Sequence, residues 1–172
     1  MLNRVVHRLK QFIFALKSRM TEDDRNFTRK YLKISEAALF DQLPEDIQKH
    51  SVMVARRALE IFMGHRYKID ERTLVRASLL HDVGKGLSRM GILDRTFFVM
   101  LRGAFPALYD RLAARGGRAG VHRDHAELAV ELLRKAGVEE EVIEAVKGHN
   151  RPAAEGDSNE LMILRKIDEG EI

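Results

Sequence analysis

Apolar residues recur at helical spacing in almost every part of this chain, and that pattern decides its fold class. In residues 2–20 the apolar side chains fall on one face of a helix and basic side chains on the other. No segment shows the alternation of apolar and polar residues that a half-buried strand requires. The sequence therefore predicts an all-α protein. The apolar positions of the first segment are Leu2, Val5, Val6, Leu9, Phe12, Ile13 and Leu16.

Capping residues frame several of these helices. Thr21 and the acids behind it indicate one start, Pro44 and Gly64 bracket a second helix, and Asp70 caps a third helix that we expect to stop at Gly84. The basic stretch RGGRAG and the polar stretch RPAAEGDSN are predicted as loops. Further helices are predicted for ILDRTFFVMLRGAF, ALYDRLAAR, DHAELAVELLRKAG, VEEEVIEAVKGHN and ELMILRKIDEGEI.

Composition narrows the class of protein. The chain has 172 residues, 45% of them hydrophobic and 33% charged, which suffices for one well-filled core. It contains no cysteine, so disulfides and thiolate metal sites are excluded. No stretch is long and apolar enough for a membrane span, and no signal peptide is visible, so we expect a cytoplasmic protein. A net charge of only +4 and the lack of tryptophan argue against a nucleic-acid partner.

Histidines and aspartates lie on the apolar faces of the predicted helices. His50 follows Ile47 by three residues and precedes Val54 by four, which places it on the inner stripe. A buried carboxylate without a partner is costly, and so is an imidazole with unsatisfied nitrogens. Any one histidine alone is explained by a bond to a backbone carbonyl, whereas a shared divalent metal satisfies the whole set. The other members are His81, Asp82, His125, His149 and Asp168.

The order of these residues resembles a known family. His50, then the pair His81-Asp82, then Asp168 looks like the ligand order of the HD superfamily of metal-dependent phosphohydrolases, and HDVGK is similar to its central motif. The stretch HAELAVELLRKAGVEEEVIEAVKGHNRP is similar to the part in which many members supply two further metal-binding histidines, here His125 and His149. The resemblance runs from Ile47 to the C-terminus. It implies a helical core around a metal centre and hydrolysis of phosphate esters or anhydrides, often of nucleotides.

The resemblance suggests how the chain is divided. We expect an HD-like domain over residues 43–172 and a helical extension over residues 1–42 that packs on it. The basic amphipathic segment 2–20 has two alternatives, which are attachment to an anionic membrane surface and formation of a homodimer. HD-type domains can also act as nucleotide-sensing or protein-binding modules without turnover. Retention of the whole ligand set favours an enzyme.

The donor types indicate the ions that such a centre would hold. Neutral imidazoles and carboxylate oxygens suit iron or manganese, with magnesium, nickel and cobalt as further options. The absence of thiolates argues against a structural zinc site. A divalent ion of this kind polarises a phosphoryl oxygen and lowers the pKa of bound water. We therefore expect a divalent metal cofactor.

The residues allow two interpretations, which differ in the number of metal ions. In the first, which we favour, Asp82 bridges two ions, and His125 and His149 bind the second one. In the alternative, one ion is bound by the other ligands, while His125 and His149 hydrogen-bond the substrate. The residues expected at the metal are His50, His81, Asp82, His125, His149 and Asp168.

Lys85 is the candidate for contact with the substrate. It lies one helical turn beyond His81, where its ammonium would face the phosphate being cleaved. Together with Asp82 it forms the expected catalytic pair. The alternative is an ordinary solvated lysine that follows a helix.

An arginine-rich stretch precedes His125. Arg118 and Arg123, with Arg111 and Arg115 before them, form either a rim that attracts the substrate phosphate or part of a flexible surface loop. His122 competes with His125 for the metal. We favour His125, because it begins the apolar face of a helix whereas His122 lies in the predicted loop.

Departures from the family narrow the substrate. Asn150 follows His149 where cyclic-dinucleotide-cleaving relatives carry a second histidine, and their glycine-tyrosine-proline signature is missing, which argues against cyclic di-GMP. The motif spacing is more similar to that of small bacterial diadenosine polyphosphate hydrolases, although their central motif differs from HDVGK after the aspartate. We expect a phosphorylated small molecule, a nucleotide or dinucleotide.

Overall fold

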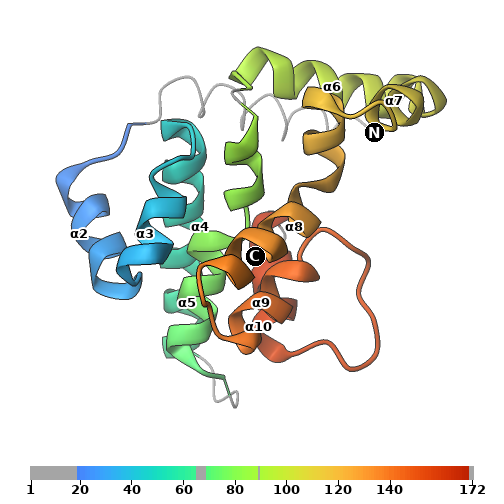
Figure 1. Cartoon of the computed structure of the whole chain (residues 1–172). Coiled ribbons are helices and arrows are strands. Elements are labelled where there is room, and N and C mark those ends of the chain that lie inside the picture. Colours follow the sequence, from blue (N-terminus) through green and yellow to red (C-terminus); the bar gives the residue numbers. More distant parts are fainter. Residues whose placement is uncertain (1–18, 65–68, 89, 171–172) are drawn as a thin grey trace.

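The computed structural model describes residues 19–64, 69–88 and 90–170, and every regular element in these ranges is helical (Figure 1). The all-α prediction is confirmed. The helix predicted for residues 2–20 lies almost wholly outside the described residues. None of the described helices has the length and apolarity needed to cross a membrane. The elements are α2 (Glu22–Tyr31), α3 (Ile34–Phe40), α4 (Glu45–Gly64), α5 (Glu71–Leu80), the 3₁₀ helix η1 (Val83–Leu87), α6 (Ile92–Ala104), α7 (Pro106–Ala113), α8 (Gly117–Lys135), α9 (Glu140–Lys147) and α10 (Asn159–Asp168).

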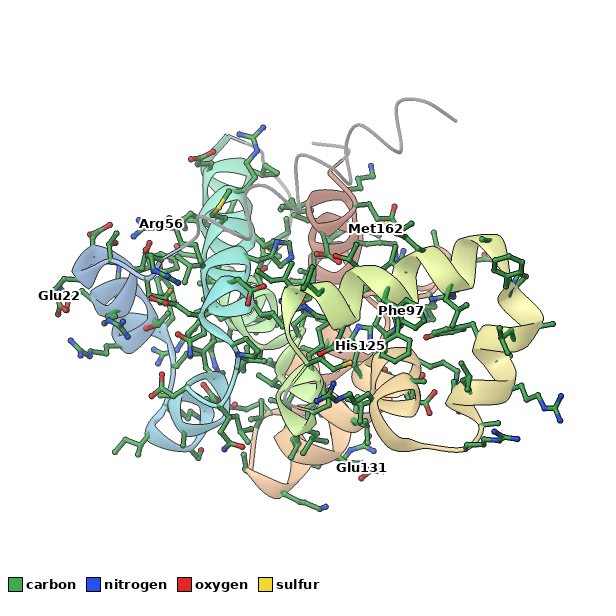
Figure 2. The ribbon with its side chains drawn as sticks, turned by 90° about the horizontal axis from the view of Figure 1, so that it is seen from above. Glu22, Arg56, Phe97, His125, Glu131 and Met162 are labelled. Atoms are coloured by element: carbon green, nitrogen blue, oxygen red, sulfur yellow. The ribbon has the colours of Figure 1, made fainter. Side chains whose placement is uncertain are left out.

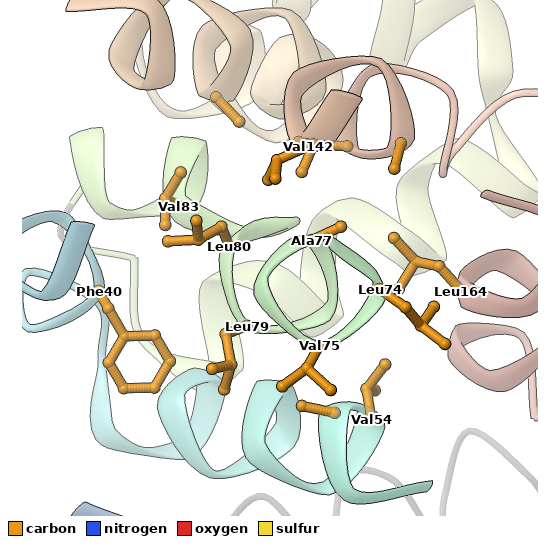
Figure 3. Close-up of a cluster of buried hydrophobic side chains, with 14 of the residues drawn as sticks. Phe40, Val54, Leu74, Val75, Ala77, Leu79, Leu80, Val83, Val142 and Leu164 are labelled. Carbon is orange, nitrogen blue, oxygen red and sulfur yellow. The ribbon is translucent and has the colours of Figure 1, made fainter. Parts of the chain in front are cut away.

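Helix α5 forms the centre of the protein. Every residue from Leu74 to Leu80 is buried, so the helix beyond its first turn has no face toward water. Helices α4, α9 and α10 pack around it, and α2 and α3 also contact it (Figure 3). A helix that is surrounded in this way must be apolar on all sides or have partners for its polar groups. In α5 most of the buried residues are apolar, and the buried polar ones have partners.

The polar residues of α5 have partners. The hydroxyl of Ser78 donates to the carbonyl of Leu74 at 2.8 Å. The guanidinium of Arg76 pairs with Glu36 of α3 and with Glu139, the N-cap of α9. Arg76 and Lys33 both bond the Glu139 carboxylate, and they lower its pKa to about 2. This buried cluster fixes the first turn of α9 and the short α3 against the central helix.

Two helix starts follow the sequence prediction. Thr21 and Asp24 form a reciprocal cap on α2, because the Thr21 hydroxyl accepts from the Asp24 amide at 3.2 Å and the Asp24 carboxylate accepts from the Thr21 amide at 2.9 Å. Asp70 caps α5 by accepting from the amide of Thr73 at 2.6 Å. Both caps use short polar side chains of the expected type.

Other boundaries differ from the prediction. Helix α3 was not predicted, because it has seven residues and Lys33 stands at its N-cap. The helix expected to reach Gly84 ends at Leu80, after which the chain turns into η1. The predicted loop before His125 is also wrong: α8 begins at Gly117 and continues through this region, with a kink at Asp124.

The first helices join the same core as the later ones. Tyr31, Leu32 and Phe40 are buried in one hydrophobic cluster with the side chains of α5, α9 and α10. Within the described residues, α2 packs on α4 and α5. The domain boundary at residue 42 stays a prediction.

The contact between η1 and α8 depends on a glycine. A Cβ atom on Gly84 would lie 1.9 Å from the carbonyl oxygen of His125 and 2.9 Å from the amide nitrogen of Ala129. No L side chain can occupy that space, so the two backbones meet only because residue 84 is glycine. This close approach holds η1, which follows Asp82, against the turn of α8 that carries His125.

We predict that Gly84→Ala separates η1 from α8 and lowers stability by about 1–3 kcal/mol, the usual cost of forcing extra volume into a packed interior. Gly86→Ala is the matched control, because its Cβ would meet its nearest neighbour, a Gln42 oxygen, at an ordinary 3.5 Å. Urea denaturation measures both variants. Equal stability of the two would contradict the role assigned to Gly84.

Candidate metal centre

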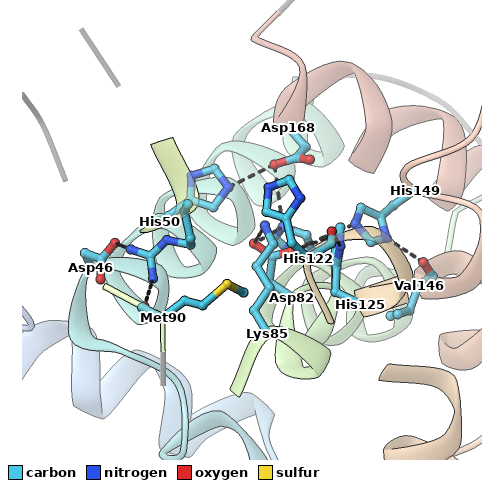
Figure 4. Close-up of polar contacts among 12 residues, drawn as sticks. Asp46, His50, Asp82, Lys85, Met90, His122, His125, Val146, His149 and Asp168 are labelled. Carbon is cyan, nitrogen blue, oxygen red and sulfur yellow. Dashed lines mark hydrogen bonds and ion pairs between the residues drawn. The ribbon is translucent and has the colours of Figure 1, made fainter. Parts of the chain in front are cut away.

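The six side chains proposed as metal ligands converge on one place in the structure (Figure 4). They form three overlapping groups of three, and within each group the donor atoms lie within 4.8 Å of one another. Each ligand comes from a different element or element end. The contributors are His50 in α4, His81 at the end of α5, Asp82 at the start of η1, His125 in α8, His149 after α9 and Asp168 at the end of α10.

Asp82 stands at the centre of the cluster. Its Oδ2 lies 3.5 Å from the Nε2 of His81, while its Oδ1 lies 3.7 Å from the Nε2 of His125 and 4.0 Å from the Nε2 of His149. The two carboxylate oxygens therefore face different sets of imidazoles. A carboxylate in this position can contribute one oxygen to each of two neighbouring sites.

Asp168 completes the other side. Its Oδ1 is bonded to the Nε2 of His50 at 2.9 Å and lies 3.5 Å from the Nε2 of His81. His81 thus stands between two carboxylates, from η1 and from α10, which are 86 positions apart in the sequence.

The backbone sets the orientation of three imidazoles. The Nδ1 atoms of His81, His125 and His149 lie 2.8, 3.1 and 2.6 Å from the carbonyl oxygens three residues before them. A carbonyl oxygen can only accept, so each Nδ1 carries the proton and donates it. In the neutral ring the Nε2 then has a free lone pair, and all three lone pairs are directed toward the carboxylate of Asp82. This tautomer leaves Nε2 free to bind a metal.

Two buried atoms in the cluster lack hydrogen-bond partners among the described residues. They are the Nε2 of His81 and the Oδ1 of Asp82. An unsatisfied buried polar atom costs about 1–3 kcal/mol, and more when it is charged. Coordination to divalent cations would satisfy both atoms, so the donor set fits such ions.

The electrostatics of His81 agree with that fit. Burial alone would lower the pKa of this imidazole, but the charges of Asp82 and Asp168 outweigh burial and raise the pKa to about 9. Burial also opposes ionisation of Asp82, yet the nearby Lys85 and His81 hold the pKa of that carboxyl far below its ordinary value. The cluster therefore favours positive charge at the position between its carboxylates.

The other two imidazoles behave as neutral bases. Burial is the main cause that lowers the pKa of His125 to about 3, assisted by Lys85, and that lowers the pKa of His149 to about 4, assisted by His81. Neutral imidazole is the form that binds transition metals. Both rings are in that form at neutral pH.

The site has a closed floor and an open rim. The side chains of His81, Asp82 and His149 are at most 3% exposed, whereas that of His50 is 37% exposed. Lys85 lies at the same rim, 26% exposed, with its Nζ 2.6 Å from the Oδ2 of Asp82. It is therefore not simply a solvated lysine, because its ammonium pairs with the central carboxylate of the cluster.

The predicted arginine rim has local partners. Arg118 pairs with Asp94 of α6 at 3.1 Å, and Arg123 forms two bonds with its neighbour Asp124. Both arginines lie on the first part of α8, which is helical rather than a flexible loop. Neither one contacts the six ligands through a bond that the structure shows, so their binding of phosphate stays a prediction.

His122 does not join the cluster. Its Nδ1 lies 2.7 Å from the hydroxyl of Tyr109, and its ring also packs near Phe98. It belongs to none of the three groups of donor atoms, whereas His125 does.

An ion-pair clamp holds the loop after His149, and sequence analysis did not identify it. Arg165 of α10 donates to the carbonyl of Gly148 and to Asp157, both at 3.0 Å, and Asp157 also pairs with Arg151. Arg165 is buried and lies one turn before Asp168. Helix α10 therefore holds Gly148, the residue before the candidate ligand His149, and also carries the candidate ligand Asp168. Its spacing of four residues from Leu161 was the available signal, because it places Arg165 on the inner face.

We predict that the stability of the folded protein depends on the ionisation of the Asp157 carboxyl. Bonds from the amide of Ala154 and from Arg151 lower the pKa of this carboxyl from 3.8 to about 2. The stabilisation is therefore complete above pH 4 and is lost as the pH falls toward 2. Asp157→Asn should unfold more easily than wild type at pH 5, and the two proteins should converge near pH 2 in urea titrations. A difference that is constant with pH would count against the clamp.

Comparison with known proteins agrees with this geometry. A family model described as HD domain matches residues 47–170, which is most of the chain and includes all six candidate ligands. No curated protein and no solved structure is significantly similar to the chain. The resemblance seen in the sequence is thus confirmed over the part that holds the cluster. The chain belongs to the HD-domain family.

Proposed function

We propose that this protein is a metal-dependent phosphohydrolase that cleaves a phosphate ester or anhydride of a nucleotide or dinucleotide. HD-domain proteins are generally metal-dependent hydrolases, which supports the class of reaction. The observation that carries the proposal is the set of three imidazoles whose Nδ1 atoms are fixed by the backbone and whose Nε2 atoms face Asp82. A helical core needs no such arrangement for its packing.

The proposed ligand sets share one carboxylate. His50, His81 and Asp168, with the Oδ2 of Asp82, would hold one ion. His125 and His149, with the Oδ1 of Asp82, would hold a second. Bound there, divalent ions would polarise a phosphoryl oxygen and make water a stronger nucleophile at neutral pH. Four imidazoles and two carboxylates favour iron or manganese.

Side chains of the protein would orient the site and stabilise charge on the substrate. Asp82 is fixed by burial, so it orients both halves of the site. Lys85 offers positive charge at the open rim, where a substrate phosphate would arrive, and stabilises negative charge that develops there. His50 and Asp168 are partly exposed, and their bond at 2.9 Å joins α4 to the end of α10.

The alternative is a nucleotide-sensing or protein-binding module without turnover. It would need the cluster for binding or for stability but not for hydrolysis. The experiments below separate these two functions.

The first experiment measures activity. Protein loaded with Mn²⁺ or Fe²⁺ should hydrolyse at least one compound in a panel of nucleoside phosphates, dinucleoside polyphosphates and aryl phosphates. Asp82→Asn should lower the rate at least about a hundredfold, as expected when one electrostatic group is lost from an active site. Asp110→Asn, a substitution at an exposed position of α7, is the control. Metal-replete wild type that cleaves nothing would leave the binding module as the function.

The second experiment counts ions. We expect about two metal equivalents in wild type and about one in each of His125→Ala and His149→Ala, because each variant removes a ligand from the second set only. His122→Ala is the matched control, since it removes an imidazole three residues from His125 that bonds Tyr109, and it should keep both ions. One equivalent in all four proteins, by elemental analysis, would show a single-ion centre.

A further inference from the structure

Large apolar side chains are exposed along one face of α6. Of the nine such residues exposed in the described part of the chain, five lie between residues 93 and 108. Leu93, Phe97 and Met100 are spaced four and three apart and are 75%, 57% and 67% exposed. They form a continuous stripe along the helix, here called the α6 stripe, which Figure 2 shows at Phe97.

The other face of α6 is already used. Phe98 packs near Tyr109 of α7 and His122 of α8, and Leu101 is buried. Helix α6 is therefore apolar on two faces, of which only one is covered by described residues. A helix of this kind normally has a neighbour on both faces. The exposed stripe thus lacks a partner within the described structure.

The described chain starts next to α6. The side chain of Arg19 pairs with Glu45 at 3.3 Å, and the amide of Met20 donates to the same carboxylate at 3.0 Å. The next residue, Asp46, pairs with Arg95 in the first turn of α6. The first described residues therefore lie near the start of α6.

The residues that precede them have a matching apolar face. Leu2, Val5, Leu9, Phe12 and Leu16 fall on one side of a helix by their spacing, and residues 1–20 contain no acidic residue. Seventeen residues in a helix span roughly 26 Å and the thirteen residues of α6 roughly 20 Å, so the lengths match. The basic opposite face would stay in water.

We propose that residues 2–18 pack as a helix on the α6 stripe of the same molecule. The tether favours this occupant over a second copy or a membrane, because a segment linked to its site has an effective concentration near the millimolar range. The contact would cover Leu93, Phe97 and Met100 and brace α6 where Arg95 pairs with α4. It does not depend on the proposed hydrolase activity.

The chain has no cysteine, which permits a direct test with introduced pairs. The variant Phe12→Cys with Phe97→Cys should form a disulfide within one molecule under mild oxidation. The control is Phe12→Cys with Ile34→Cys, because Ile34 is 92% exposed on α3, away from the stripe. We expect the first pair to close at least about tenfold faster, with a yield independent of protein concentration. Non-reducing electrophoresis distinguishes monomers from dimers.

Three results would overturn the proposal. Disulfides between molecules at residue 97 would make the stripe an interface between two copies. Equal rates for both pairs, or no closure of either, would show that the segment does not rest on α6. Binding of the full-length Phe97→Cys variant to vesicles rich in anionic lipid, without protection of the introduced thiol from thiol reagents, would assign the segment to a membrane.

A second measurement covers the case in which the cysteines themselves weaken the contact. Leu93→Ser with Met100→Ser should speed trypsin cleavage after the basic residues of segment 2–18, because the helix would lose its partner. The matched control is Met53→Ser, an exposed apolar residue on α4. Unchanged cleavage in the double variant would overturn the proposal.

Discussion

A carboxylate that is almost fully buried, that of Asp82, imposes the main constraint on this structure. Removing an ionised carboxylate from water costs several kcal/mol unless cations and donors surround it. Here the surrounding groups are Lys85 of η1 and imidazoles from the end of α5, from α8 and from the residue after the C-cap of α9, so these elements must all meet at one point. Gly84 contributes to this arrangement, because it lets the chain just after Asp82 reach the backbone of α8.

The central helix carries a second buried ionic group, and the contrast between the two is informative. The guanidinium of Arg76 is matched by Glu36 and Glu139, so that cluster is complete within the protein. At the other end of α5, His81 and Asp82 keep buried atoms that have no hydrogen-bond partner in the described part of the chain. A complete cluster fixes helices relative to one another. An incomplete one, with strongly shifted pKa values, is the arrangement expected of a binding or catalytic site.

The sequence predicted most of this site because helical spacing reports which side chains face inward. The positions of His50, His125 and Asp168 followed from their apolar neighbours alone. Short-range features were harder to predict: α3 has only seven residues, and the Arg118 region is helical although its glycines suggested a loop. The pairing of Arg118 with Asp94 and the clamp through Arg165 depend on tertiary contacts, which spacing along one helix does not encode.

The bonds from imidazole Nδ1 atoms to carbonyls three residues earlier have a kinetic consequence. His81 and His149 stand just past the last turns of α5 and α9, and those turns supply the carbonyls that hold them. Such an imidazole can swing out only when the helix end frays. Release of an ion held by these imidazoles would then require the terminal turns to open, and amide hydrogen exchange at the two helix ends would report the rate of that opening.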